Sequence, residues 1–140
     1  MKSNTLLIQI SFFIQHQIDC VIHFAALKAV GESCRLPLMY YGNNITGSAN
    51  LMEVMMEFGV KKIVFSSSAT VYGDPEYLPV DEKHPTGKCT NPYGKTKYFM
   101  EEIIKDVCAA NNVSDYIITN VNGILVVIFD FSSRIGVQCY

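Results

Sequence analysis

Three residues have types and a spacing suited to proton transfer: Ser68, Tyr93 and Lys97. Tyr93 and Lys97 are four residues apart, and on a helix side chains at that spacing share a face. A lysine ammonium near a phenol favours the phenolate and lowers the pKa of the tyrosine from about 10. Tyr93 is therefore a candidate general base near neutral pH, and Ser68 could hydrogen-bond the same substrate oxygen. Lys95 projects elsewhere and is predicted to be an exposed surface charge.

Two short apolar runs predict the strands that would position these residues. Residues 21–26 and 62–66 are apolar and bounded by polar segments, which is typical of buried parallel strands. The run at 124–129 reads as a further buried strand, since six residues are far short of the roughly 20 that span a bilayer. Ser66, Ser67 and Ser68 follow the second strand directly.

Two helices are predicted between and after these strands. The first covers residues 37–58 and is followed by Gly59, as is usual at a helix C-terminus. Pro92 occupies the first turn of the second helix, which runs to about Ala110 after a polar loop at about 73–91. The predicted apolar stripe of the first helix comprises Leu38, Tyr41, Ile45, Ala49, Met52 and Met56.

Strands that alternate with helices predict an α/β fold with a parallel sheet. In such sheets ligands bind beyond the carboxyl ends of the strands, where the three serines lie. Other residues are predicted to have structural roles only. His23 and the cluster of Met52, Met55 and Met56 are expected to belong to the core. His16 and His84 are predicted to be surface residues.

Composition excludes several classes of protein. With 49% hydrophobic residues and a formal charge of −2 from 11 basic and 13 acidic residues, the chain is neither disordered nor suited to general nucleic-acid binding. Its five cysteines are an odd number without a CxxC pair, which argues against a disulfide framework and a zinc site. Free thiols in the cytoplasm and no metal are the expectation.

Four stretches, in this order and spacing, resemble the UDP-galactose 4-epimerase (UDP-glucose 4-epimerase) family of the extended short-chain dehydrogenase/reductase superfamily. Ala69 and Thr70 stand where related dehydratases usually carry an acidic pair, which favours the epimerases. The stretches are VIHFAALKAVGES at 21–33, YYGNNITG at 40–47, VFSSSATVYG at 64–73, and PTG at 85–87 through NPYGKTK at 91–97.

The resemblance implies an NAD-dependent reaction through a 4-keto sugar, in which Tyr93 takes the proton of the 4-hydroxyl and NAD accepts the hydride from C4. Lys97 would bind the nicotinamide ribose and tune Tyr93, and Ser68 would bind the sugar oxygen. The implied cofactor-binding residues are Phe24, Ala25, Ala26, Lys28, Asn43, Asn44, Ser66, Tyr93 and Lys97, with Ala26 where the family usually has glycine. The implied substrate-binding residues are Lys28, Ser68, Ala69, Thr70 and Tyr93.

The resemblance covers residues 18–111, which we expect to form part of an NAD-binding domain, an incomplete Rossmann-like, doubly wound parallel sheet with flanking helices. Residues 1–17 and 112–140 diverge, and no glycine-rich phosphate-binding turn precedes residue 21. The chain is therefore expected to be a cytoplasmic epimerase fragment, inactive alone, with a UDP-sugar as the family's substrate and no nucleic-acid or membrane partner. The alternatives are a non-catalytic short isoform or interaction module, and another sugar-nucleotide epimerase or dehydratase. Family members commonly form homodimers through helices that correspond to 37–58 and 92–110.

Overall fold

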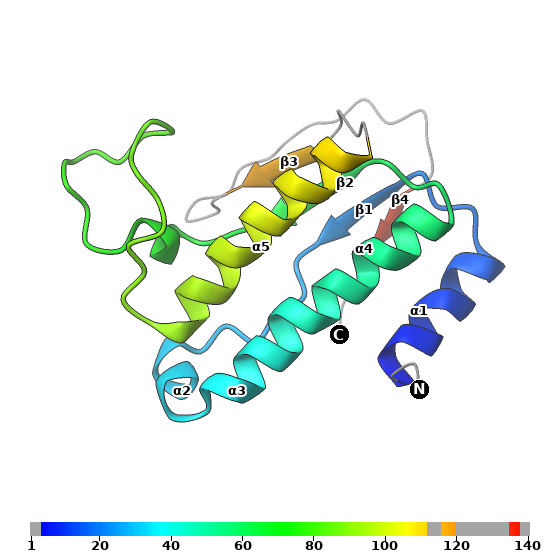
Figure 1. The fold of residues 1–140 in the computed structure, drawn as a ribbon, viewed down its shortest axis with the longest axis horizontal. Coiled ribbons are helices and arrows are strands. Elements are labelled where there is room, and N and C mark those ends of the chain that lie inside the picture. The colour runs from blue at the N-terminus through cyan, green and yellow to red at the C-terminus, as the bar shows by residue number, and fades with distance from the viewer. Residues whose placement is uncertain (1–3, 112–115, 120–134, 138–140) are drawn as a thin grey trace.

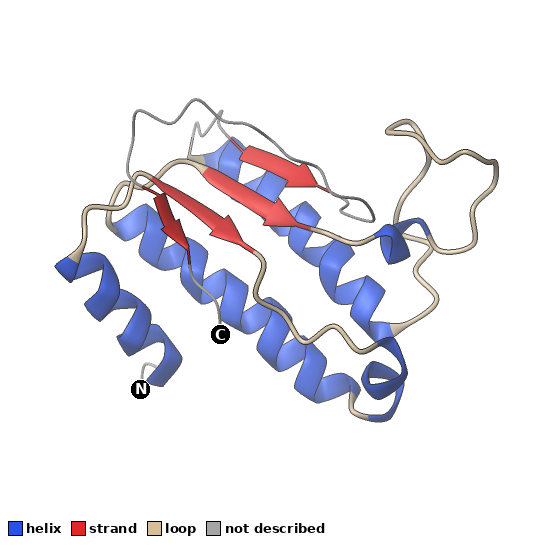
Figure 2. Ribbon diagram, turned by 180° about the vertical axis from the view of Figure 1, so that it is seen from behind, coloured by secondary structure: helices blue, strands red, loops and turns tan. Residues whose placement is uncertain are grey.

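A four-stranded parallel sheet forms the centre of the computed structural model, which describes residues 4–111, 116–119 and 135–137 (Figures 1 and 2). The strands lie in the order β3-β2-β1-β4, so the direction of the winding reverses between β1 and β4. Every neighbouring pair is parallel, and the carboxyl ends therefore meet at one edge. The predicted α/β class is confirmed. The strands are β1 (Cys20–His23), β2 (Ile63–Ser66), β3 (Tyr116–Thr119) and β4 (Ile135–Val137).

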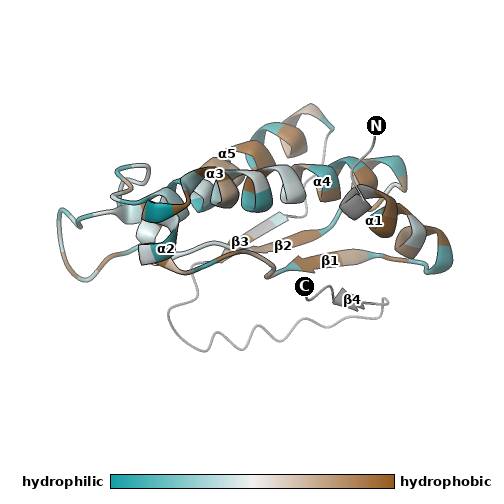
Figure 3. Ribbon diagram, turned by 90° about the horizontal axis from the view of Figure 1, so that it is seen from below, coloured by the Kyte–Doolittle hydropathy of each residue, from teal (hydrophilic) through white to brown (hydrophobic). Residues whose placement is uncertain are grey.

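The described helices lie on one face of this sheet (Figure 3). The three longest are α1 (Asn4–Gln15), α4 (Gly47–Glu57) and α5 (Pro92–Ala110). The bounds of α5 match the predicted second helix, because Pro92 fits its first turn and the Asn91 side chain caps it by accepting from Gly94 N. Two short helices, α2 (Val30–Arg35) and α3 (Pro37–Tyr40), precede α4. The predicted strand at 124–129 lies outside the described residues.

The predicted helix over 37–58 is present, but it contains a wider π-helical turn at Tyr41–Thr46 between α3 and α4. Gly59 follows it with φ +71°, the left-handed conformation expected at a helix end. The predicted apolar stripe is wrong at its start, since Leu38 is 84% exposed. The prediction assumed that the inward face would be wholly apolar. The buried residues instead include polar ones that find hydrogen-bond partners, and the face runs through Tyr40, Asn44, Ser48, Leu51 and Met55.

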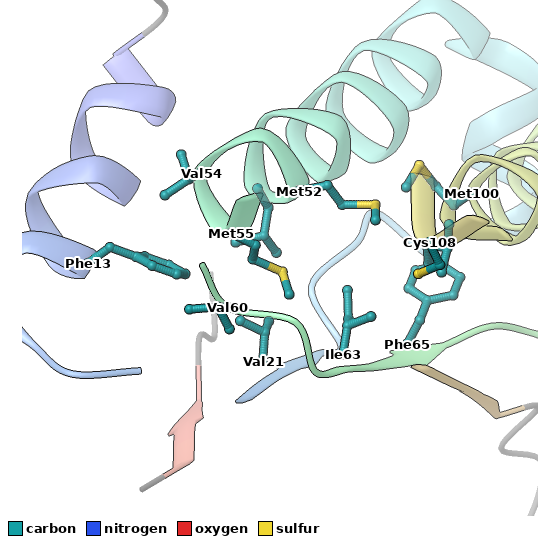
Figure 4. Close-up of a cluster of buried hydrophobic side chains, with 12 residues drawn as sticks. Phe13, Val21, Met52, Val54, Met55, Val60, Ile63, Phe65, Met100 and Cys108 are labelled. Atoms are coloured by element: carbon teal, nitrogen blue, oxygen red, sulfur yellow. The ribbon is translucent and has the colours of Figure 1, made fainter. Parts of the chain in front are cut away.

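The hydrophobic core lies between the sheet and these helices (Figure 4). Met52 and Met55 are buried in it, and Met56 packs against it, as predicted. Helix α1 adds Phe13, whose ring lies 5.7 Å from that of Phe58. The core also contains Val21, Leu51, Val54, Val60, Ile63, Phe65, Met100, Ile104 and Cys108.

A close backbone contact sets the distance between α5 and the 3-10 turn Ala69–Tyr72 that follows β2. A Cβ atom placed on Gly94 would lie 2.9 Å from the carbonyl oxygen of Thr70 and 3.1 Å from its side chain. Only a glycine lets the first turn of α5 approach this closely. The contact joins the segment that carries Tyr93 to the segment that carries Ser68.

We expect Gly94→Ala to destabilise the chain by about 1–3 kcal/mol, because α5 and the 3-10 turn must separate to admit the methyl group. Gly31→Ala is the matched control. Gly31 is also helical, its added Cβ would meet nothing within 4 Å, and the change should stabilise by up to about 1 kcal/mol. Denaturant unfolding measures both. Equal effects of the two substitutions would contradict the close contact.

Candidate functional site

A cavity of about 440 Å³ opens where the carboxyl ends of β1 and β2 face the start of α5. All three candidate catalytic residues, Ser68, Tyr93 and Lys97, line it. They come from two elements, since Ser68 follows β2 and the other two share one face of α5. The remaining lining residues are Phe24, Ala26, Lys28, Ser66 and Ser67.

Lys97 is almost fully buried, with 4% of its surface exposed. Its Nζ donates to the carbonyl oxygen of Ser66 at 2.7 Å and lies 4.8 Å from the centroid of the Phe65 ring. A carbonyl oxygen and the face of an aromatic ring both attract an ammonium group. Burial nevertheless disfavours the charged form and lowers the pKa of Lys97 to about 8. Lys97 therefore remains mostly protonated at pH 7. Lys95, by contrast, is exposed, as predicted.

The hydroxyl of Ser68 is held by the 3-10 turn that it caps. Its Oγ accepts from Thr70 Oγ1 at 2.9 Å and from Thr70 N at 3.3 Å. Because Ser68 accepts in both bonds, its own hydroxyl hydrogen is available to donate to a ligand in the cavity. Thr70 thus orients the serine through its side chain and its backbone.

Tyr93 is fixed through its backbone on two sides. Its N–H, one of the unpaired donors of the first helical turn, donates to Ser33 Oγ at 3.2 Å. Its carbonyl oxygen accepts from Thr96 Oγ1 at 2.7 Å. Ser33 is fully buried in α2 and donates in turn to the carbonyl oxygen of Val30. The phenol-bearing residue is therefore tied to the short helix after β1.

Asn44 connects three segments around the cavity. Its side chain accepts from Leu27 N at 2.8 Å and donates to Leu27 O at 2.9 Å, which fixes the loop after β1. Its Nδ2 also donates to Thr96 Oγ1 on α5 at 3.1 Å. The π-helical turn that carries Asn44 is a feature often found at functional sites. Asn44 lines neither cavity described here. It affects the site indirectly, by fixing the loop after β1 and the first turns of α5.

A second cavity, of about 390 Å³, adjoins the first at Ala26, which lines both. Its walls are mostly apolar and come from α1, the end of β1, the loop after it, and the segment 43–51. Two predicted cofactor residues, Ala25 and Asn43, line it together with Ala26. The other lining residues are Ile8, Gln9, His23, Leu27, Gly47, Ser48 and Leu51.

The structure thus brings most of the predicted site residues to the two cavities. Ala69 and Thr70 lie in the adjacent 3-10 turn and line neither. Sequence reasoning missed Ser33, and it missed the buried pair of Ser67 and Glu101, whose side chains hydrogen-bond. The signal for Glu101 was its spacing, because it follows Lys97 by one helical turn and so shares its face.

The prediction that His84 lies on the surface is wrong, since only 4% of it is exposed. Its ring lies between those of Tyr72 and Tyr77, with centroids 5.4 and 4.7 Å away. Its Nε2 accepts from Glu76 N, and its Nδ1 hydrogen-bonds the carbonyl oxygen of Pro85. The histidine organises the loop that precedes α5. The polar residues that flank His84 in sequence suggested that it is exposed. In the structure Tyr72 and Tyr77 cover its ring.

Within the described residues no group of three or more His, Cys, Asp or Glu side chains is placed to hold a metal ion. In the same part of the chain, no helix has both the length and the apolar character needed to cross a bilayer.

Comparison with known proteins identifies the family. The sequence pattern of the NAD dependent epimerase/dehydratase family matches residues 7–124. The chain belongs to this family. Two curated relatives are the UDP-glucose 4-epimerases of Drosophila melanogaster, 65% identical over 101 residues, and of Mus musculus, 63% identical over 99 residues. These alignments cover 72% and 71% of the chain but 29% and 28% of the relatives.

Solved structures of this epimerase/dehydratase family have the same fold. The UDP-glucose 4-epimerase of Bifidobacterium longum, determined in complex with NAD+ and UDP, superposes with a TM-score of 0.81 at 45% identity. The superposition covers 86% of the chain and 36% of that structure. The incomplete, Rossmann-like character predicted for the sheet is confirmed by this match.

His23 lines the second cavity and begins a hydrogen-bond chain to the π-helical turn. Its Nε2 lies 2.7 Å from Ser48 Oγ, which donates to Asn44 O at 2.6 Å. The prediction of a buried, satisfied histidine is confirmed. Burial, and secondarily the charge of Lys97, lower the pKa of His23 to about 4. The folded chain therefore favours the neutral form of this imidazole.

We expect acid to weaken the fold through His23. Its pKa is about 4 in the folded chain and about 6.5 in the unfolded chain, so its contribution is present above pH 6.5 and is lost as the pH falls towards 4. The free energy of unfolding should fall by up to roughly 3 kcal/mol more in the wild type than in His23→Gln. Urea unfolding at pH 7 and pH 4 measures this difference.

His16→Gln is the matched control, because His16 is exposed. This variant should keep the pH dependence of the wild type. If His23→Gln also keeps it, His23 is not the group through which acid acts.

Proposed function

We propose that this chain carries the proton-transfer site of a UDP-glucose 4-epimerase, the activity named for its relatives. The observation that carries the proposal is the convergence of Ser68, Tyr93 and Lys97 on one cavity at the carboxyl edge of a parallel sheet. The chain spans about 29% of the length of the curated relatives it matches. The proposal therefore covers the proton-transfer residues of the reaction and not the whole reaction.

The two adjoining cavities support NAD as the cofactor. A dinucleotide has two nucleoside halves joined by a diphosphate, and the cavities meet at a single residue, Ala26. Phe24, Ser66 and Lys97 would hold the half nearest the reacting groups. Ala25 and Asn43 would line the other half, where mostly apolar walls suit a heterocyclic base. When bound, NAD supplies a hydride acceptor.

The residues of this chain would then handle the proton and the substrate. Tyr93 takes the proton of the sugar hydroxyl, and the ammonium of Lys97 stabilises the negative charge on the phenolate. Ser68 donates its free hydroxyl hydrogen to the same sugar oxygen, in the position that Thr70 gives it. Lys28 is exposed at the cavity and brings a positive charge suited to a diphosphate.

We expect the purified chain to bind NAD and Lys97→Met to weaken that binding at least about tenfold, or ~1.4 kcal/mol, because the variant loses the ammonium inside the cavity. Lys95→Met is the matched control, since Lys95 is an exposed lysine on the same helical turn, and it should bind NAD as the wild type does. Isothermal titration calorimetry measures all three. In a competent chain of the relatives' full length, Tyr93→Phe should retain NAD and nearly abolish the conversion of UDP-galactose to UDP-glucose.

Two results would contradict the proposal. Equal NAD affinities of Lys97→Met and Lys95→Met would remove Lys97 from the cofactor site. Conversion of UDP-galactose at an undiminished rate by Tyr93→Phe in the full-length chain would remove Tyr93 as the base.

We further propose that two copies of the chain pair through α3 and α5. These helices contact each other and share an exposed apolar surface, which consists of Leu38 at 84%, Met39 at 42% and Phe99 at 42% exposure. Tyr41 stacks on Phe99 with ring centroids 6.4 Å apart and extends this surface. Apolar side chains in such a group favour burial against a matching surface.

Leu38→Glu should shift the chain from dimer to monomer in sedimentation equilibrium, because it places two carboxylates in the paired surface. Leu78→Glu is the matched control. Leu78 is 79% exposed but lies in the loop before α5, and its substitution should leave the dimer intact. A wild-type chain that sediments as a monomer would contradict pairing.

A further inference from the structure

Two neighbouring hydrogen bonds tie the end of β2 to α5. The first joins Lys97 Nζ to the carbonyl oxygen of Ser66 at 2.7 Å. The second is a short hydrogen bond from Ser67 Oγ to Glu101 Oε1. Lys97 and Glu101 are one helical turn apart and the two serines are adjacent. The two hydrogen bonds therefore lie side by side between the end of β2 and α5.

The hydrogen bond between Ser67 and Glu101 requires an unfavourable removal of a carboxyl group from water. Glu101 is 5% exposed and Ser67 6% exposed, so an acidic side chain is removed from water in order to accept from one hydroxyl. Burial raises the pKa of Glu101, and the hydrogen bond from Ser67 opposes that rise only in part. For stability alone, a well-packed apolar pair in such a place is often as good or better. The pair therefore calls for a role other than stability.

Its position suggests that role. Ser67 lies between Ser66, whose carbonyl oxygen holds Lys97, and Ser68, whose hydroxyl lines the cavity. Fixing the side chain of Ser67 restricts the backbone that orients both neighbours. Ser67 lies between the last residue of β2 and the cap of the 3-10 turn, so its bond to Glu101 anchors the one serine of the run that belongs to neither element.

We propose that Glu101 is a positioning residue, which acts through Ser67 to hold the Ser66 carbonyl against Lys97 and the Ser68 hydroxyl in the cavity. The inference rests on the proposed function, in which Lys97 and Ser68 are the working groups. Glu101 itself lines neither cavity, so it acts only through Ser67. The charged neighbours of its carboxyl group are Lys105 and Glu102 on the same helix, and the thiol of Cys89 faces it from the loop before α5.

The test follows the titration of Lys97 by NMR in chain labelled with [13Cε]lysine, with the signal assigned by its loss in Lys97→Met. The pKa of Lys97 is about 8 in the wild type. In Glu101→Met and in Ser67→Ala it should rise to about 9 or above, towards the ordinary value of about 10.4, because a released Lys97 returns to water. Glu101→Gln keeps an oxygen acceptor and should restore the wild-type value.

Glu102→Met is the matched control, since Glu102 is the next residue and its side chain is 46% exposed. It should leave the Lys97 titration unchanged. If folded Glu101→Met and Ser67→Ala keep a Lys97 pKa of about 8, the pair is only structural and the inference is overturned. Ser67→Ala removes a single oxygen, and it decides the question even if Glu101→Met fails to fold.

Failure of the proposed function gives a different result. The Lys97 titration needs neither NAD nor a sugar nucleotide. A wild-type chain that binds no NAD, but whose Lys97 responds to Glu101→Met, would overturn the cofactor proposal and leave the positioning role of Glu101 intact.

Discussion

A buried ammonium group is the constraint on which the arrangement of this chain depends. Lys97 is almost completely removed from water, and its ammonium group contacts one carbonyl oxygen and the face of one aromatic ring. Neither partner carries a full negative charge, so the ammonium is held at a cost that its lowered pKa reflects. Such a group stays in place only if the strand that supplies its partners cannot move. Ser66 and Phe65 both belong to β2, and α5 must therefore pack on that strand in one register.

The rest of the site can be understood as the means of fixing that register. Gly94 allows α5 to approach the backbone after β2, and Asn44 joins the same helix to the loop after β1. Ser33 adds a tie from α2 to the first turn of α5. These contacts come from segments far apart in sequence, and each meets α5 within two turns of Tyr93. A shift of the helix by one residue would break all of them together.

How much of this could be predicted from the sequence depends on whether the signal was local. Pro92 and the Asn91 cap define the start of α5 locally, and Gly59 the end of α4, so these boundaries were predicted. The shared helix face of Tyr93 and Lys97 was predicted because a four-residue spacing is a property of one helix. The burial of His84 was missed because its cover depends on how the loop folds back. The inward face of the helix over 37–58 was misplaced at its start, where Leu38 is exposed and the buried residues include Asn44, whose partner Thr96 lies on α5. The spacing of Glu101 from Lys97 indicated a shared helix face, but its partner Ser67 is 34 residues away and could not be predicted locally.

The strand order explains why two adjoining cavities lie at the carboxyl edge of so small a sheet. The winding reverses beside β1, and in open parallel sheets such a reversal separates the loops at the carboxyl edge and leaves a crevice between them. The loop after β1 is the segment next to that crevice, and Ala26 in this loop lines both cavities. A ligand that occupied both cavities would contact the chain at Ala26. The methyl group of Ala26 limits how near such a ligand can come to the loop. The hydrogen bonds of Asn44 to Leu27 set the position of this loop, and they therefore affect both cavities at once.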